Sequence, residues 1–346
     1  MGLVQPLTIA SASITPFQLT LRKPFTFGGN TVTERVGFYL KLITTTGLPA
    51  QGEIAPLPGI SSETIRKAQH DLEEIKPYLT KWEIPADKKD LIAKIRSDAH
   101  FSSLCHSVRF GIESALFSLA ASVCSQSLVE FLGGDLSNVS SAALLQGTHQ
   151  EVLNDAKMMS TEGVRVFKLK VGDRNIPLDV KKVQDLRSII GKQGSLRLDG
   201  NRVWSLQEAL LFVELIGLKQ IEFIEEPLSD IAKINVFYEQ THMPVALDET
   251  LSVLRCGISA PGRCSPTLAH NEAVKAYVLK PMILGGIIAT LDWIEEARQN
   301  GKKAIISSCF ESVIGLKVLA DLSLLTGQVA GLGTARWLYG NQDLLK

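Results

Sequence analysis

Short apolar segments alternate with helical segments from about residue 140 onward, and this alternation constrains the fold more than any other feature of the sequence. Apolar runs separated by longer helix-forming stretches are typical of parallel β/α units. The expected strands cover residues 142–147, 165–171, 195–199, 220–225, 244–248, 276–280, 303–307 and 328–332. Helices are expected between them, for example at 150–162, 177–190, 205–217, 286–299 and 311–325. Eight strands joined by helices over roughly 200 residues predict a (β/α) barrel with one or more irregular units.

The preceding part of the chain has a different order of elements. Strands are expected first and helices after them, at 7–20 and 35–45, then at 61–79, 86–97 and 107–123. Strands followed by helices, without alternation, indicate an α+β domain. We therefore expect an α+β domain over residues 1–125, completed by residues 335–346, and a barrel over residues 126–334.

A glycine-rich segment separates the first two expected strands. It reads Lys-Pro-Phe-Thr-Phe-Gly-Gly-Asn over residues 23–30, and its Gly-Gly-Asn part favours a turn or a mobile loop. Phe25 and Phe27 either cover a ligand or form a small apolar cluster, and the sequence alone leaves both interpretations open.

The composition argues against several classes of partner. The 346 residues include 36 Lys and Arg and 36 Asp and Glu, so the formal net charge is zero and no nucleic-acid partner is expected. Five scattered cysteines without a Cys-x-x-Cys pair indicate reduced thiols. No apolar run reaches the ~18 residues of a membrane span, and no secretion signal is recognisable. We expect a cytoplasmic protein that does not bind membranes, of undetermined oligomeric state.

The strand expected at 165–171 contains two lysines. Successive side chains of a strand point to opposite faces, so Lys168 and Lys170 share one face. Repulsion between two ammonium groups, together with burial, lowers the pKa of one of them. A lysine tuned in this way can act as a general base near neutral pH. The alternative is a solvated strand face.

Charged residues also end the next strands along the chain. Asp199, Glu225, Asp248 and Lys280 each come at or just after the last residue of an expected strand. The carboxyl ends of the strands of a barrel meet at one mouth, where active sites lie. Three carboxylates there need a compensating charge, and an all-oxygen ligand set favours Mg²⁺. Spacing alone does not decide between Glu225 and Glu226.

Taken in order, Lys168-Leu169-Lys170, Asp199-Gly200-Asn201, Glu225-Glu226-Pro227, Asp248-Glu249 and Lys280 resemble the enolase superfamily, and within it the muconate-lactonizing-enzyme subgroup. The resemblance covers nearly the whole chain and implies a (β/α)₇β modified TIM barrel with an N-terminal α+β capping domain. Three further segments resemble the branch of this subgroup that forms o-succinylbenzoate. They are residues 52–59, 107–113 and 306–312.

The resemblance implies a role for each site residue. Mg²⁺, or Mn²⁺ in its place, is held by Asp199, Glu225 and Asp248. Lys170 is the base that removes the α-proton. Lys168 lowers the pKa of Lys170 and contacts the substrate carboxylate, while Lys280 stabilises the enediolate from the other side. The implied substrate contacts are Arg197, Asn201, Ser307, Ser308 and Phe25.

The implied reaction is a syn dehydration of the small carboxylate 2-succinyl-6-hydroxy-2,4-cyclohexadiene-1-carboxylate to o-succinylbenzoate, in menaquinone or phylloquinone synthesis. N-succinylamino acid racemisation needs the same two lysines and remains an alternative. Dipeptide epimerases carry an Asp-x-Asp motif at the eighth strand, where this chain reads Gly331-Leu332-Gly333-Thr334. A catalytically inactive scaffold is disfavoured because all five charged residues are present.

Overall fold

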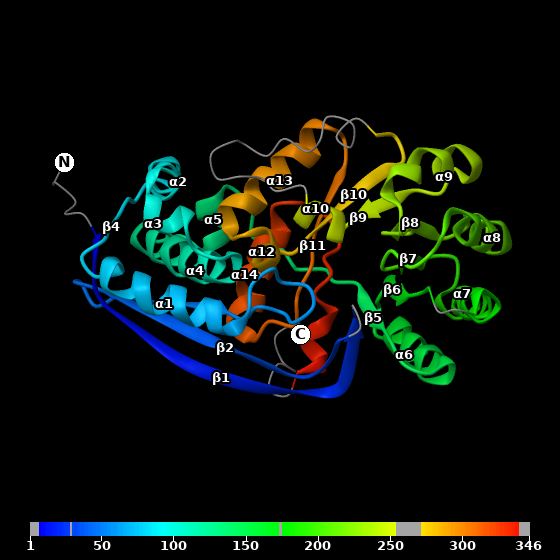
Figure 1. The fold of residues 1–346 in the computed structure, drawn as a ribbon, viewed down its shortest axis with the longest axis horizontal. Coiled ribbons are helices and arrows are strands. Elements are labelled where there is room, and N and C mark those ends of the chain that lie inside the picture. The colour runs from blue at the N-terminus through cyan, green and yellow to red at the C-terminus, as the bar shows by residue number, and fades with distance from the viewer. Residues whose placement is uncertain (1–6, 28–29, 173–174, 254–270, 339–346) are drawn as a thin grey trace.

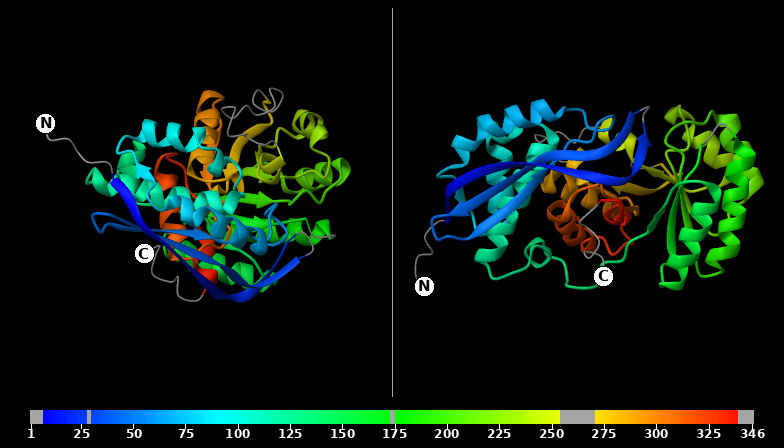
Figure 2. Two further views of the ribbon diagram at one scale, coloured as in Figure 1. Left: turned by 60° about the vertical axis from the view of Figure 1, so that its left-hand side comes forward. Right: turned by 90° about the horizontal axis from the view of Figure 1, so that it is seen from below.

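An antiparallel sheet of four strands and a parallel sheet of seven strands organise the chain (Figures 1 and 2). The structure is a computed structural model that describes residues 7–27, 30–172, 175–253 and 271–338. The first sheet and the helices next to it in sequence form the part that we call the cap. The second sheet curls into the barrel.

A long hairpin dominates the cap. Strands β1 (Leu7–Phe27) and β2 (Asn30–Thr44) pair along most of their length, and pairing resumes at Phe25 opposite Val32 after an irregularity. The expected loop at 23–30 was therefore wrong for most of its residues, because both strands extend into it. Gly28 and Gly29 lie outside the described residues. Strands β3 (Pro49–Ile54) and β4 (Glu83–Ile84) complete the order β3-β2-β1-β4.

The cap helices begin at side-chain caps that the sequence supplies. Helix α1 (Ile65–Leu79) follows Thr64, whose side chain accepts from the amide of Lys67, and α2 (Lys88–Ser97) is capped in the same way by Asp87. The short helix α3 (Ala99–Ser102) leads into α4 (His106–Val123), which is buried along most of its length and packs against β3. Helix α5 (Leu128–Leu132) leads to the barrel.

Seven parallel strands form the barrel wall in the spatial order β11-β10-β9-β8-β7-β6-β5. They are β5 (Ala143–Leu145), β6 (Val166–Lys170), β7 (Ser195–Asp199), β8 (Ile221–Glu225), β9 (Val245–Leu247), β10 (Val274–Leu279) and β11 (Lys303–Ile306). The expected eighth strand at 328–332 is reduced to two residues. Ala330 bridges to Ser141 and Gly331 bridges to Ser307, both in parallel, so this short segment joins the two edges of the sheet.

Helices surround the barrel and connect its strands (Figure 1). They are α6 (His149–Thr161), α7 (Ile176–Ile190), α8 (Leu206–Ile216), η1 (Ile231–Lys233), α9 (Ile234–Thr241), α10 (Glu249–Val253), α12 (Pro281–Leu284), α13 (Ile287–Gln299), α14 (Val313–Leu324) and η2 (Gly333–Trp337). None of the described helices is long and apolar enough to cross a membrane.

Two buried glutamates of the cap bind the starts of two barrel helices. Glu53 accepts hydrogen bonds from the amides of Ser312 and Gly315, at the start of α14. Glu113 accepts from the amide of Ile288, at the start of α13. Carboxylates are favourable at these positions because the first amides of a helix lack intrahelical acceptors. The segments 52–59, 107–113 and 306–312 that were grouped by resemblance therefore meet at the interface of cap and barrel.

The C-terminal residues return to the cap. Leu338 forms an antiparallel bridge with Leu21 of β1, and η2 lies next to β5. The expected completion of the cap by residues 335–346 stays a prediction, because residues 339–346 lie outside the described part of the chain.

Candidate active site

The charged residues expected at the barrel mouth come from the ends of consecutive strands. Lys170 of β6 is opposite Asp199 of β7, and Asp199 is opposite Glu225 of β8. Asp248 and Lys280 directly follow β9 and β10. Because the paired strands are parallel and in register, these side chains reach one edge of the sheet together.

Lysine ammonium groups lie between the carboxylates. The Nζ of Lys168 is 2.8 Å from both carboxylate oxygens of Glu225 and 2.9 Å from Oδ2 of Asp199. Lys280 forms an ion pair with Asp248. Within the described ranges, no three His, Cys, Asp or Glu side chains already form a metal-binding set. Lys168 and Lys280 place positive charge directly beside these carboxylates.

The pKa values at the mouth follow from burial and from these pairs. Burial raises the pKa of Glu225 well above its ordinary value, and Asp199 adds to the rise, while Lys168 opposes it. Burial also acts to raise the pKa of Asp248, but Lys280 lowers it below the ordinary value. For Lys168 the lowering effect of burial is outweighed by Asp199 and Glu225, so its pKa is raised. Repulsion between Lys168 and Lys170 therefore does not lower the pKa of Lys168 below its ordinary value.

The structure distinguishes Glu225 from Glu226. Glu225 faces Lys168 inside the mouth. Glu226 has a positive φ of 43° and turns the other way, where it accepts hydrogen bonds from the amides of Asp248 and Thr250 and from the Thr250 hydroxyl. Glu226 therefore holds the turn after β9, and Glu225 remains the candidate ligand.

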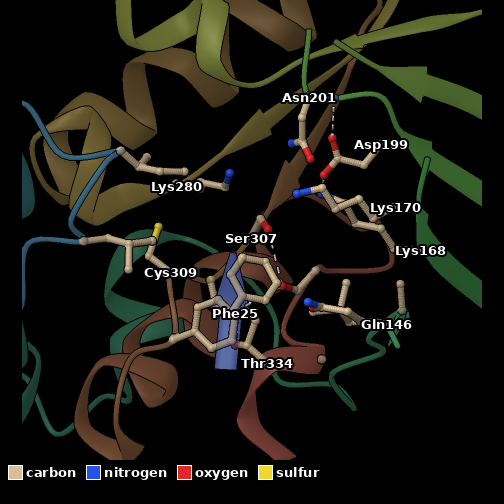
Figure 3. A pocket seen from close by; sticks show the side chains of 18 of the residues that line it. Phe25, Gln146, Lys168, Lys170, Asp199, Asn201, Lys280, Ser307, Cys309 and Thr334 are labelled. Atoms are coloured by element: carbon tan, nitrogen blue, oxygen red, sulfur yellow. Dashed lines mark hydrogen bonds and ion pairs between the residues drawn. The ribbon is translucent and has the colours of Figure 1, made fainter. Parts of the chain in front are cut away.

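A cavity of about 90 Å³ opens between these charged groups and the cap. Figure 3 shows Lys168 and Lys170 on one side of it and Lys280 on the other. Apolar side chains of the cap, of strand β5 and of the loop after β11 cover the remaining walls, namely Phe25, Leu57, Ile60, Leu144 and Phe310. The Phe25 ring packs against Phe310 at 4.7 Å between centroids and lies 5.9 Å from the Nζ of Lys170.

Four of the five expected substrate contacts line this cavity: Phe25, Asn201, Ser307 and Ser308. Arg197 does not line it. Its side chain lies deeper in the barrel, where it forms an ion pair with Glu222 at 2.7 Å and donates to the carbonyl of Val329 at 2.8 Å. Arg197 and Asp199 share a strand face, but Arg197 is two residues further from the mouth.

Several lining residues were missed in the sequence. Gln146 follows β5, Leu57 and Ile60 come from the loop after β3, and Thr334 comes from η2. The Gln146 position carried a signal, since it is a polar residue next to the end of the strand expected at 142–147. Thr334 and the two cap residues had no such signal, because only the tertiary fold brings their loops to the mouth.

Two known protein families match parts of the chain. "Enolase C-terminal domain-like" matches residues 151–343, and "MenC, N-terminal domain" matches residues 9–119. The o-succinylbenzoate synthase of Haemophilus influenzae is 33% identical over 79% of this chain and 74% of its own length. The chain belongs to the o-succinylbenzoate synthase family. The family member of Vibrio cholerae is 30% identical over 93% of this chain and 89% of its own.

One relative is a much longer protein. Protein PHYLLO of Arabidopsis thaliana, a chloroplastic protein, is 31% identical over 88% of this chain. The match spans only 19% of PHYLLO, so it concerns one part of that protein.

Solved structures of the superfamily share this fold. The dipeptide epimerase of Enterococcus faecalis, solved with Mg and a dipeptide, has a TM-score of 0.83 at 21% identity over 96% of this chain and 92% of that one. The muconate lactonizing enzyme of Pseudomonas fluorescens has a TM-score of 0.81 at 21% identity over 97% and 90%. These likenesses confirm the capped barrel architecture.

Proposed function

We propose that this chain is an o-succinylbenzoate synthase. It would remove water from 2-succinyl-6-hydroxy-2,4-cyclohexadiene-1-carboxylate and release o-succinylbenzoate, in menaquinone or phylloquinone synthesis. The observation that carries the proposal is the set of three lysines around buried carboxylates at one barrel mouth, in a chain of this family.

The donor set at the mouth fits a divalent metal ion. Burial and the nearby Asp199 raise the pKa of Glu225, so the carboxylates are crowded in a way that a cation relieves. We propose that Asp199, Glu225 and Asp248 hold Mg²⁺, with Mn²⁺ as an alternative, and that the ammonium groups of Lys168 and Lys280 withdraw when it binds. The metal supplies positive charge that stabilises the substrate carboxylate as its α-proton leaves.

Lys170 is the proposed base. It lines the cavity on the same wall as Asp199 and is separated from Lys280 by the width of the cavity (Figure 3). In a syn dehydration the proton and the hydroxyl leave from the same face of the ring. Lys170 would therefore take the proton and return it to the departing hydroxyl, which leaves as water.

Lys280 would balance the negative charge that develops on the substrate as the proton is removed. Its ion pair with Asp248 places a buried ammonium group on the wall opposite Lys170. A fixed positive charge in a buried site stabilises a developing anion more than the same charge in water does. Lys168, which lies beside the carboxylates, would contact the substrate carboxylate.

The apolar walls suit the rest of the substrate. Phe25 and Phe310 would pack on the ring, while Ser307, Ser308 and Asn201 offer polar contacts at the edge of the cavity. The chemical demand on the protein is modest, because loss of water completes an aromatic ring. The remaining barrier is removal of a weakly acidic proton, which the lysines and the metal address.

The test is loss of the cyclohexadiene chromophore with purified protein, with Mg²⁺ and then with excess EDTA. We expect rapid, Mg²⁺-dependent loss and formation of o-succinylbenzoate. A folded protein that binds Mg²⁺ but does not turn this substrate over contradicts the proposal. In that case N-succinylamino acids in deuterated water are the next substrates, because racemisation needs the same two lysines.

A further inference from the structure

Gln146 stands beside the proposed base. Strands β5 and β6 are parallel, with Leu144 opposite Lys168 and Leu145 opposite Leu169. Continued by one residue, the same register sets Gln146 next to Lys170, and both side chains line the cavity (Figure 3). Adjacent strands are about 4.8 Å apart, so a ligand atom within reach of Lys170 is also close to Gln146.

The side-chain oxygen of Gln146 is buried and has no hydrogen-bond partner in the described structure. A buried acceptor without a donor is costly and calls for an explanation. The hydroxyls on the same wall are engaged within the protein. Ser307 bonds the carbonyl of Gly331 at 3.4 Å, and Ser308 bonds the hydroxyl of Thr334. Gln146 thus brings to this wall a buried acceptor that has no partner among the described residues.

The chemistry of the substrate identifies the matching group, provided that the proposed function holds. At neutral pH both carboxylates and the ketone of the substrate only accept hydrogen bonds, and its 6-hydroxyl is its single donor. That hydroxyl leaves from the ring face that Lys170 reaches. We propose that the Oε1 of Gln146 accepts a hydrogen bond from the 6-hydroxyl and holds it beside Lys170.

This contact has a direct consequence for the elimination. With its own hydrogen directed to Gln146, the hydroxyl oxygen presents a lone pair to the ammonium group of Lys170. Lys170 gains a proton from C1 and gives it to this oxygen as the C6–O bond breaks. The electrons of the C1–H bond form the new C1–C6 double bond, water leaves, and the enzyme returns to its starting state.

If the side-chain amide of Gln146 had the opposite orientation, a different result would be expected. Turned by 180°, Gln146 would donate its amide hydrogens to the succinyl ketone or carboxylate, groups that the product o-succinylbenzoate also carries. The hydroxyl contact, in contrast, is lost in the product. Binding of substrate and product therefore separates the two orientations.

The test compares wild type with Gln146→Met, which keeps the length of the side chain and removes the acceptor. We expect kcat for dehydration to fall about 10- to 100-fold, while the Kd of o-succinylbenzoate stays within about twofold. In deuterated water, recovered substrate should gain more deuterium at C1 per turnover, because departure of the hydroxyl lags behind proton removal. In Gln146→Asn the acceptor remains, but the side chain is shorter by one methylene. Its kcat should lie between the values of wild type and Gln146→Met.

Three outcomes overturn the inference. Equal weakening of product affinity and kcat would assign Gln146 to the succinyl group, and unchanged kcat would remove it from the reaction. A loss of thermal stability without a change in the deuterium ratio would leave it a structural residue and also count against the inference. Failure of the proposed function itself is seen separately, as absent dehydration by the wild type.

Discussion

Two regions of this protein bury carboxylates against different partners. At the barrel mouth, Asp199, Glu225 and Asp248 are paired with lysine ammonium groups. Between cap and barrel, Glu53 and Glu113 accept hydrogen bonds from backbone amides at the starts of α14 and α13. Burial raises the pKa of Glu225 at the mouth and of both interface glutamates.

The difference lies in how freely each partner can leave. An amide in the first turn of a helix is fixed by the helix, so a carboxylate bound to it ties two elements together. An ammonium group ends a flexible four-carbon chain and can move to another anion. The interface glutamates therefore hold one arrangement of cap and barrel, whereas the mouth carboxylates can exchange their lysines for a metal ion or a substrate.

The largest expected effect concerns the lysines of the mouth. Lys170→Ala should lower the dehydration rate about 10²- to 10⁴-fold, because it removes the proposed base, and the protein should stay folded. Initial rates and circular dichroism measure both. The control is Lys182→Met, which removes a buried lysine paired with Asp179 at 3.3 Å outside the catalytic cavity. Substantial activity in Lys170→Ala would show that another group is the base.

The second effect, stabilisation by Mg²⁺, distinguishes the carboxylates of the mouth from those of the interface. Mg²⁺ at about 100 times its Kd should stabilise the wild type by about 2.7 kcal/mol. Asp248→Asn should abolish this gain, because it removes a proposed ligand. Glu53→Gln should keep the gain on a less stable protein, because Glu53 only binds the start of α14. Thermal unfolding with and without Mg²⁺ measures each case, and loss of the gain in Glu53→Gln would show that the interface glutamate also takes part in metal binding.

The third effect is a pH dependence of the free energy of unfolding, caused by Glu113 at the interface of cap and barrel. Burial raises the pKa of Glu113 from 4.5 to about 7, although Arg109 and the amides of Ile287 and Ile288 act to lower it. Between these values the folded state holds a proton that the unfolded chain has released. The free energy of unfolding therefore falls as the pH rises through this range, by about 3 kcal/mol.

Glu113→Gln is the control for this effect. It keeps an acceptor for the amide of Ile288 but cannot titrate, so this part of the pH dependence should disappear. Urea denaturation at a series of pH values compares the two proteins. Equal slopes in wild type and variant would mean that Glu113 is ionised at the interface throughout.

The two regions also differ in how far the sequence predicts them. The mouth residues were recognisable because strand alternation fixes their common face and the strand ends fix their common level, as for Lys170 and Asp199. Arg197, which the family resemblance implied as a substrate contact, shares this face but lies one layer deeper. The choice between Glu225 and Glu226 needed the backbone, since a turn with positive φ rotates Glu226 away.

The interface could not be predicted from residue types. The partners of Glu53 and Glu113 are amides, which every residue except proline carries, and they lie 259 and 175 residues away in the chain. The hairpin shows the same limit. Two strands were correctly expected in this part of the chain, but cross-strand pairing carries both strands further than their own propensities indicated.

The smallest expected effect concerns an ion pair on the surface. Lys23 of the hairpin pairs with Glu151 of α6 at 2.6 Å, and about half of each side chain is exposed. This pair resembles that of Lys280 and Asp248 in its groups but not in its surroundings, because water competes for both charges. Lys23→Met should therefore raise the KM of the substrate by at most about threefold at low salt.

Measuring KM at high salt tests whether solvent exposure explains the small effect of the Lys23–Glu151 pair. At about 0.5 M ionic strength the screening length is only ~4 Å, so the KM values of wild type and Lys23→Met should converge. The hairpin also carries Phe25 into the cavity, and packing of Phe25 on Phe310 does not depend on salt. A tenfold rise in KM that persists at high salt would show that Lys23 positions the hairpin as firmly as the buried pairs position their elements.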